Sequence, residues 1–68
     1  MNYIQEKDIV RLKRNVDHEL QKGLVGTVLQ CHSDKFEIHF PLQGKNIHAQ
    51  LPLQDIEFVT RSEILLQR

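Results

Sequence analysis

Apolar and polar residues alternate along three short segments of the chain, residues 8–14, 36–40 and 47–51. Successive side chains of a β-strand point to opposite faces, so this alternation is typical of strands with one buried face. Two further segments, residues 24–32 and 56–59, are rich in apolar and β-branched residues and are also expected to be strands. Five short strands at about ten-residue spacing predict an all-β barrel or sandwich, and closure into a barrel would remove exposed sheet edges.

The same alternation predicts which side chains form the core. Val10 and Leu12 are expected to face inward, and Arg11 is expected to face outward. The other expected core side chains are Phe36, Ile38, Phe40, Ile47, Ala49, Leu51, Phe58 and the thiol of Cys31, since a free cysteine is usually buried and inert. The acidic residues Asp34, Glu37 and Asp55 are scattered and are expected to be solvated.

Two glycines, Gly23 and Gly26, stand directly before and inside the strand expected at residues 24–32. A phosphate-binding loop would place such glycines between a strand and a helix, but the residues that follow are β-rich. A glycine inside a strand instead marks a bulge, a tight bend or a close approach of the backbone to a neighbour. The two glycines are therefore interpreted as structural.

Polar segments separate the expected strands. The longest, residues 15–23, contains Val16 and Leu20 and is expected to be a loop that tucks these two side chains under the sheet. Pro41 and Pro52 are expected to end strands, and the residues after Pro52 can form a single 3₁₀ turn.

Residues 60–68 depart from the strand pattern, so the chain is divided into a barrel domain, residues 1–59, and a short helical or extended C-terminal tail. Thr60 could cap a helix with Glu63 at its third position, although such a helix is too short to be stable alone. Three consecutive apolar residues in the tail could pack back on the barrel or dock on a partner. They are Ile64, Leu65 and Leu66.

The segments DIVRL, GLVGTV, FEIHF and LPLQDIEFV occur in an order that resembles a family of short bacterial SH3-like barrel proteins of unknown function. This resemblance covers residues 7–59 and implies a small five-stranded SH3-like barrel. The positions that match are Val10, Leu12, Gly23, Val25, Gly26, Thr27, Val28, Glu37, Phe40 and Asp55. The glycine-containing segment is more distantly similar to the KOW motif of ribosomal and transcription-elongation proteins, which implies contact with RNA or protein. SH3-like subunits similar in outline act as docking pieces in larger assemblies.

Size and charge narrow the possible functions. The chain has 68 residues, and its 9 basic residues balance 9 acidic ones. Dedicated nucleic-acid binders usually carry a basic excess, and a domain this small has little room for a buried catalytic pocket. A net charge of zero also gives little electrostatic protection against association, so a protein partner or a second copy is plausible.

Cys31 is the only cysteine, so the chain cannot form an internal disulfide. The N-terminal residues show no apolar signal core, and no apolar run approaches the roughly 18 residues that a membrane-spanning helix needs. We therefore expect a cytoplasmic, reduced protein with no membrane association.

None of the reactive side chains has the spacing of a catalytic or metal-binding motif. The four histidines, His18, His32, His39 and His48, lack the short paired spacing of a zinc motif and are expected to be exposed and solvated. Neighbouring strand residues point to opposite faces, so Cys31 and His32 do not form a nucleophile–base pair. The chain is therefore expected not to be an enzyme, to hold no cofactor or metal ion, and to bind no small-molecule substrate.

The best candidate for a binding surface is a group of basic residues around the loop at residues 15–23. This basic cluster consists of Arg11, Lys13, Arg14 and Lys22, and it could contact phosphates, although acidic residues are interleaved with it. Two functions stay open: a non-enzymatic protein-interaction module in a larger bacterial or phage complex, and a KOW-like RNA- or DNA-binding module. The residues expected to carry the contacts are Arg11, Lys13, Arg14, His18, Leu20, Lys22, Ile64, Leu65 and Leu66.

Overall fold

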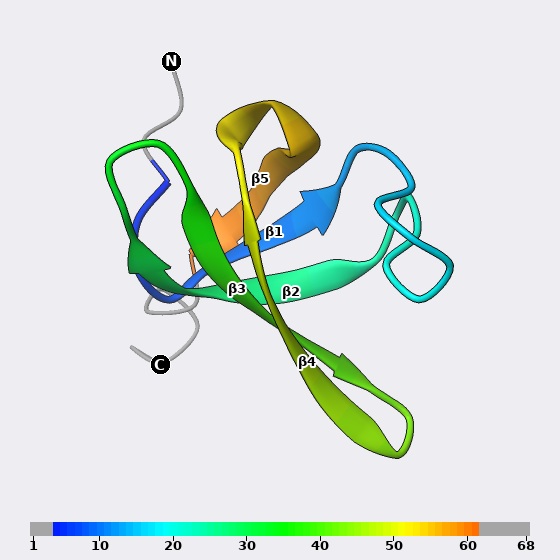
Figure 1. The fold of residues 1–68 in the computed structure, drawn as a ribbon. Coiled ribbons are helices and arrows are strands. Elements are labelled where there is room, and N and C mark those ends of the chain that lie inside the picture. The colour runs from blue at the N-terminus through cyan, green and yellow to red at the C-terminus, as the bar shows by residue number, and fades with distance from the viewer. Residues whose placement is uncertain (1–3, 62–68) are drawn as a thin grey trace.

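The computed structural model describes residues 4–61, which form five β-strands and one 3₁₀ turn (Figure 1). The elements are β1 (Asp8–Leu12), β2 (Val25–Cys31), β3 (Phe36–Leu42), β4 (Lys45–Leu51), the 3₁₀ turn η1 (Leu53–Asp55) and β5 (Ile56–Arg61). The all-β prediction is confirmed, and so is the 3₁₀ turn. The apolar tail residues Ile64, Leu65 and Leu66 lie outside the described residues, so the predictions made for them stay predictions.

The strands belong to one sheet in the order β4-β3-β2-β1-β5. Each neighbouring pair is antiparallel, and β5 returns to pair with β1. Within residues 4–61, β4 and β5 are thus the two edges of the sheet. Closure into a barrel would need these edges to pair, so the barrel stays a prediction from the sequence.

Strands β3 and β4 form a long twisted hairpin that extends beyond the other strands (Figure 1). Their pairing reaches Leu42 opposite Lys45, so only residues 43–44 form the turn. The prediction that Pro41 ends the strand is therefore wrong. The pairing of β3 with β2 ends at His39, so the part of β3 that follows has a neighbour on one side only, where a residue without an N–H group is tolerated.

Strand β5 is also longer than expected and continues to Arg61. Thr60 lies opposite Ile9 of β1, so it is a strand residue and not a helix N-cap, and the domain boundary after residue 59 falls inside the strand. The pairing shifts in register between Ile9 and Val10, which leaves Val59 as an extra residue on β5. Val59 is accordingly one of the exposed large apolar side chains.

One face of the sheet carries the core, as the alternation predicts. The buried apolar side chains are Ile4, Val10, Leu12, Leu20, Val28, Ile38, Phe40, Leu51 and Ile56. Partly buried side chains pack against them, namely Val16, Leu24, Phe36, Ile47, Ala49 and Phe58. The prediction that Val16 and Leu20 anchor their loop under the sheet is therefore confirmed.

Gly26 is buried where β2 passes over the ring of Phe40 in β3. A Cβ atom on residue 26 would lie 2.6 Å from Cδ1 of Phe40 and 2.8 Å from the carbonyl oxygen of His39. These distances are shorter than real Cβ contacts, so the fold needs glycine at this position. Of the three structural roles predicted for a strand glycine, Gly26 has the close approach, whereas Gly23 supplies a turn residue with φ of 94° before β2.

Near the end of β2, a β-bulge changes which side chains of the strand face the core. Its pairing with β3 shifts in register between Val28 and Gln30, so Leu29 is an extra residue and is exposed. Cys31 follows at the last position of the pairing, where its side chain is exposed, so the prediction of a buried thiol is wrong. The thiol lies at the end of the sheet, with Sγ 3.6 Å from the carbonyl oxygen of Ile4, rather than inside the core.

Candidate partner-binding surface

The segment between β1 and β2, residues 13–24, is an ordered loop held by its own polar groups. The side-chain oxygen Oδ1 of Asp17 accepts hydrogen bonds from the backbone N–H groups of Glu19 (2.9 Å) and Leu20 (3.0 Å). These bonds lower the pKa of Asp17 below its ordinary value of 3.8. The backbone N–H of Lys22 donates to Oδ1 of Asn15 (2.7 Å), which closes the base of the loop.

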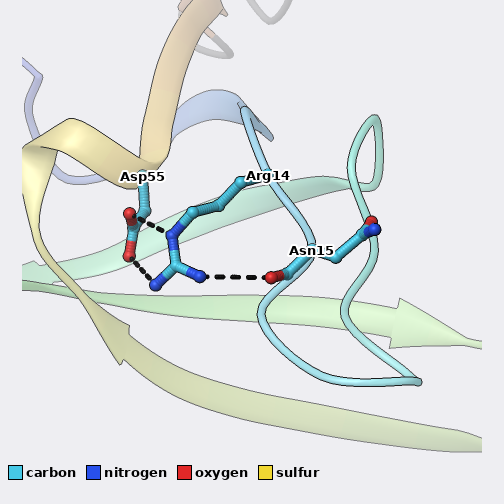
Figure 2. A network of polar contacts seen from close by, with 3 residues as sticks. All are labelled: Arg14, Asn15 and Asp55. Atoms are coloured by element: carbon cyan, nitrogen blue, oxygen red, sulfur yellow. Dashed lines mark hydrogen bonds and ion pairs between the residues drawn. The ribbon is translucent and has the colours of Figure 1, made fainter.

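Arg14 joins this loop to the 3₁₀ turn η1 (Figure 2). Its Nε donates to Oδ1 of Asp55 at 2.7 Å and its Nη2 donates to Oδ2 at 3.0 Å, while Nη1 donates to the backbone oxygen of Asn15. The carboxylate of Asp55 is buried, so the prediction that Asp55 is solvated is wrong. The hydrogen bonds to Asp55 and its negative charge raise the pKa of Arg14.

Arg11, another residue of the predicted basic cluster, also forms an ion pair. Nη2 of Arg11 lies 2.6 Å from Oε2 of Glu57 on the neighbouring strand β5. Because the charges of Arg11 and Arg14 both face carboxylates, only Lys13 and Lys22 of that cluster have side chains without a carboxylate partner among residues 4–61. These two lysines supply little positive charge for binding the phosphate backbone of a nucleic acid.

The remaining predicted contact residues divide into two groups. Lys13, His18 and Lys22 are exposed, as expected, and all three lie on the loop, although Lys13 was expected in the preceding strand, which ends at Leu12. Leu20 is only 3% exposed, so its proposed role as a partner contact is corrected: the side chain belongs to the core. The loop can therefore present its polar side chains to a partner, but not this apolar one.

A groove of about 620 Å³ lies beside η1 and β5, and of its lining residues the sequence marked only Lys13 as a contact. Its lining residues are Ile4, Lys13, Leu53, Gln54, Ile56, Glu57 and Phe58. Ile4 and Ile56 are buried core residues, so they give the groove an apolar base. Leu53 is 50% exposed, which leaves a large apolar side chain in contact with solvent at the groove.

One signal of this groove was present in the sequence. Leu53 is an apolar residue in a segment expected to be a single 3₁₀ turn, where so short an element cannot bury every side chain. The sequence could not show that Lys13 and Phe58 line the same groove as Leu53, because these residues come from distant parts of the chain.

A second hollow, of about 420 Å³, is lined by Ile4, Gln5, Glu6, Lys7 and Cys31. Partial burial raises the pKa of the Cys31 thiol above its ordinary value of 9.0, and the negative charges of Glu6 and Asp8 add to this effect. The thiol is consequently protonated near neutral pH and is a poor nucleophile.

The histidines lie as isolated residues or as pairs. His39 and His48 face each other across β3 and β4, and Nε2 of His32 lies 3.7 Å from Oε1 of Glu37. Within residues 4–61 no group of three or more histidine, cysteine, aspartate or glutamate side chains could hold a metal ion. His18, His32 and His48 are exposed as predicted, whereas His39 is half-buried.

No protein-family profile matches the chain, and no curated protein or solved structure shows significant similarity to it. In the part of the chain that the structure describes, no helix is long and apolar enough to cross a membrane. The functional interpretation therefore depends on the geometry of the groove and of the loop beside it.

Proposed function

We propose that this chain is a non-enzymatic protein-interaction module, a small subunit or regulator of a larger bacterial or phage complex, which holds a segment of a protein partner in the groove beside η1 and β5. The half-exposed side chain of Leu53 over an apolar base is the observation that carries this proposal. Protein interfaces combine an apolar centre with a polar rim, and Lys13, Gln54 and Glu57 supply such a rim.

The loop at residues 13–24 lies beside this groove and is held in place by hydrogen bonds to η1. Arg14 holds the loop to Asp55 at the end of η1, and the backbone N–H of Lys13 donates to the backbone oxygen of Asp55 at 2.8 Å. A preorganised surface loses less conformational entropy on binding than a flexible one. The five antiparallel strands and the single 3₁₀ turn also support the SH3-like barrel that the sequence resemblance implies.

The alternative is a KOW-like RNA- or DNA-binding module that uses the basic cluster. The ion pairs of Arg11 with Glu57 and of Arg14 with Asp55 count against it, because a phosphate would have to compete with a carboxylate already in place. The balanced net charge points the same way.

Affinity capture from host extract, with and without nuclease, separates these two functions. A protein partner should be retained in stoichiometric amount after nuclease treatment, and Lys22→Ala, which removes a lysine outside the groove, should leave its capture nearly unchanged. A set of partners that disappears with nuclease, or whose capture falls with Lys22→Ala and falls steeply as salt is raised, would instead assign the chain to nucleic acid.

A further inference from the structure

His39 of β3 and His48 of β4 lie directly opposite each other in the hairpin. Their ring centroids are 5.2 Å apart and their ring planes meet at 69°. Both side chains are on the face of the hairpin that does not carry the core, since Ile38 and Phe40 on either side of His39 are fully buried. Two imidazoles are thus held side by side on a rigid pair of strands.

This spacing suits a metal ion shared by the two rings. Imidazole nitrogens bind Zn²⁺ at about 2.0–2.1 Å, and at a tetrahedral angle two such rings have centroids about 5 Å apart. The observed 5.2 Å is close to this separation, and the two rings, which now meet edge-on at 69°, could each turn a nitrogen toward a shared ion by rotation about their side-chain bonds. Imidazole is a ligand that Ni²⁺, Cu²⁺ and Zn²⁺ all accept.

The contact of His39 with Asn46 adds an independent observation. Nε2 of His39 lies 3.0 Å from Oδ1 of Asn46. An amide oxygen only accepts hydrogen bonds, so this contact favours the neutral tautomer in which Nε2 carries the proton and Nδ1 keeps its lone pair. Histidines that bind metals usually donate their other ring N–H to an oxygen acceptor, which fixes the tautomer, and Asn46 is in place for that role.

We propose that His39 and His48 form a two-ligand site for a divalent ion of the Ni²⁺, Cu²⁺ and Zn²⁺ group, oriented by Asn46. The remaining coordination positions are open to water or to a donor group of a binding partner. This site lies on β3 and β4 and does not depend on the groove beside η1 and β5.

The test is a calorimetric titration of the tag-free full chain with Ni²⁺, together with nitrogen-15 NMR spectra in which paramagnetic Ni²⁺ broadens signals near the ion. We expect one ion per chain, with broadening centred on residues 39, 46 and 48. His48→Ala and His39→Ala should each weaken binding at least about tenfold, and Asn46→Ala should weaken it by about tenfold.

His32→Ala and Cys31→Ser are the matched controls, since they remove other metal-binding side chains that are also exposed. Each should keep the affinity for Ni²⁺ within about twofold, and the spectra of all variants show whether the sheet is intact. Saturable binding that survives His48→Ala in a folded protein, or the absence of saturable binding in the unmodified chain, would overturn the proposal.

Discussion

At the scale of single residues, the alternation of the sequence predicts the apolar core well and the buried acids poorly. Asp8 is fully buried in phase with Val10 and Leu12, where an apolar residue would be expected. Its Oδ2 accepts a hydrogen bond from the backbone N–H of Gln5 at 2.8 Å, and Nε of Arg61 lies 3.9 Å from its Oδ1. Gln5 contributes only a backbone N–H, which almost every residue offers, and Arg61 is distant in sequence, so neither partner leaves a local pattern that marks Asp8 as buried.

Gly26 gives the sharpest prediction at this scale. Gly26→Ala should lower the free energy of unfolding by about 1–3 kcal/mol, because its Cβ would overlap the Phe40 ring and the backbone oxygen of His39. The matched control is Gly44→Asn, because a Cβ added at residue 44 meets no atom within 4 Å and asparagine tolerates the left-handed backbone there (φ 87°) better than most residues. Urea denaturation of both variants checks the prediction, and equal stabilities of Gly26→Ala and the unmodified chain would contradict it.

The lowered pKa of Asp17 predicts that the free energy of unfolding depends on pH. Its pKa in the folded chain is lowered from 3.8, so the unfolded chain binds the proton more readily than the folded chain does. The contribution of this carboxylate is therefore fully present above pH 3.8 and is lost as the pH falls through the lowered pKa. The stability difference between the unmodified chain and Asp17→Asn should grow from about pH 2 to about pH 5 and then stay constant.

Asp34→Asn is the control for this experiment, because it removes one carboxylate from the turn between β2 and β3. Denaturant unfolding at several pH values, with an NMR titration of the Asp17 side chain, provides the measurement. A midpoint at or above 3.8 would show that the loop hydrogen bonds do not hold the ionised form.

At the scale of elements, the existence and order of the strands follow from the sequence, whereas their ends do not. The structure extends β3 through Pro41 and β5 to Arg61, because pairing with a neighbouring strand outweighs the local signals for a strand end. A bulge was one of the interpretations of the strand around Gly26, but the sequence did not place it at Leu29, so the exposure of Cys31 was not predicted. Register depends on the partner strand, so a single strand's sequence specifies it weakly.

The link between the loop and η1 gives a prediction for these elements. Arg14→Ala should destabilise the chain more than Arg11→Ala, since the first leaves the buried carboxylate of Asp55 without its partner and the second breaks only an exposed pair with Glu57. Asp55→Ala should cost about 1–3 kcal/mol. A double-mutant cycle in urea measures the coupling between Arg14 and Asp55, and additive effects of the two substitutions would contradict the proposed link.

At the scale of the whole molecule, the sequence predicts a small all-β domain, but it does not show which charges of the predicted binding surface are paired with carboxylates. The basic cluster is conspicuous in the sequence, yet the fold brings Glu57 to Arg11 and Asp55 to Arg14 and so reduces its positive charge. The groove that replaces it as the leading candidate gathers residues from the N-terminal segment, the loop, η1 and β5. Neither the neutralised charges nor the groove could be seen before these segments were placed side by side.

The central claim is that a protein partner binds in this groove through Leu53, and one comparison tests it most directly. The partner captured from host extract is titrated against the unmodified chain, Leu53→Asp and Leu29→Asp. Both substitutions place a charge at an exposed leucine, but Leu29 does not line the groove. We expect Leu53→Asp to weaken binding about 30-fold or more, as loss of a central interface side chain does, and Leu29→Asp to leave it nearly unchanged. Equal affinities of the two variants, or selective loss with Leu29→Asp, would place the binding surface elsewhere.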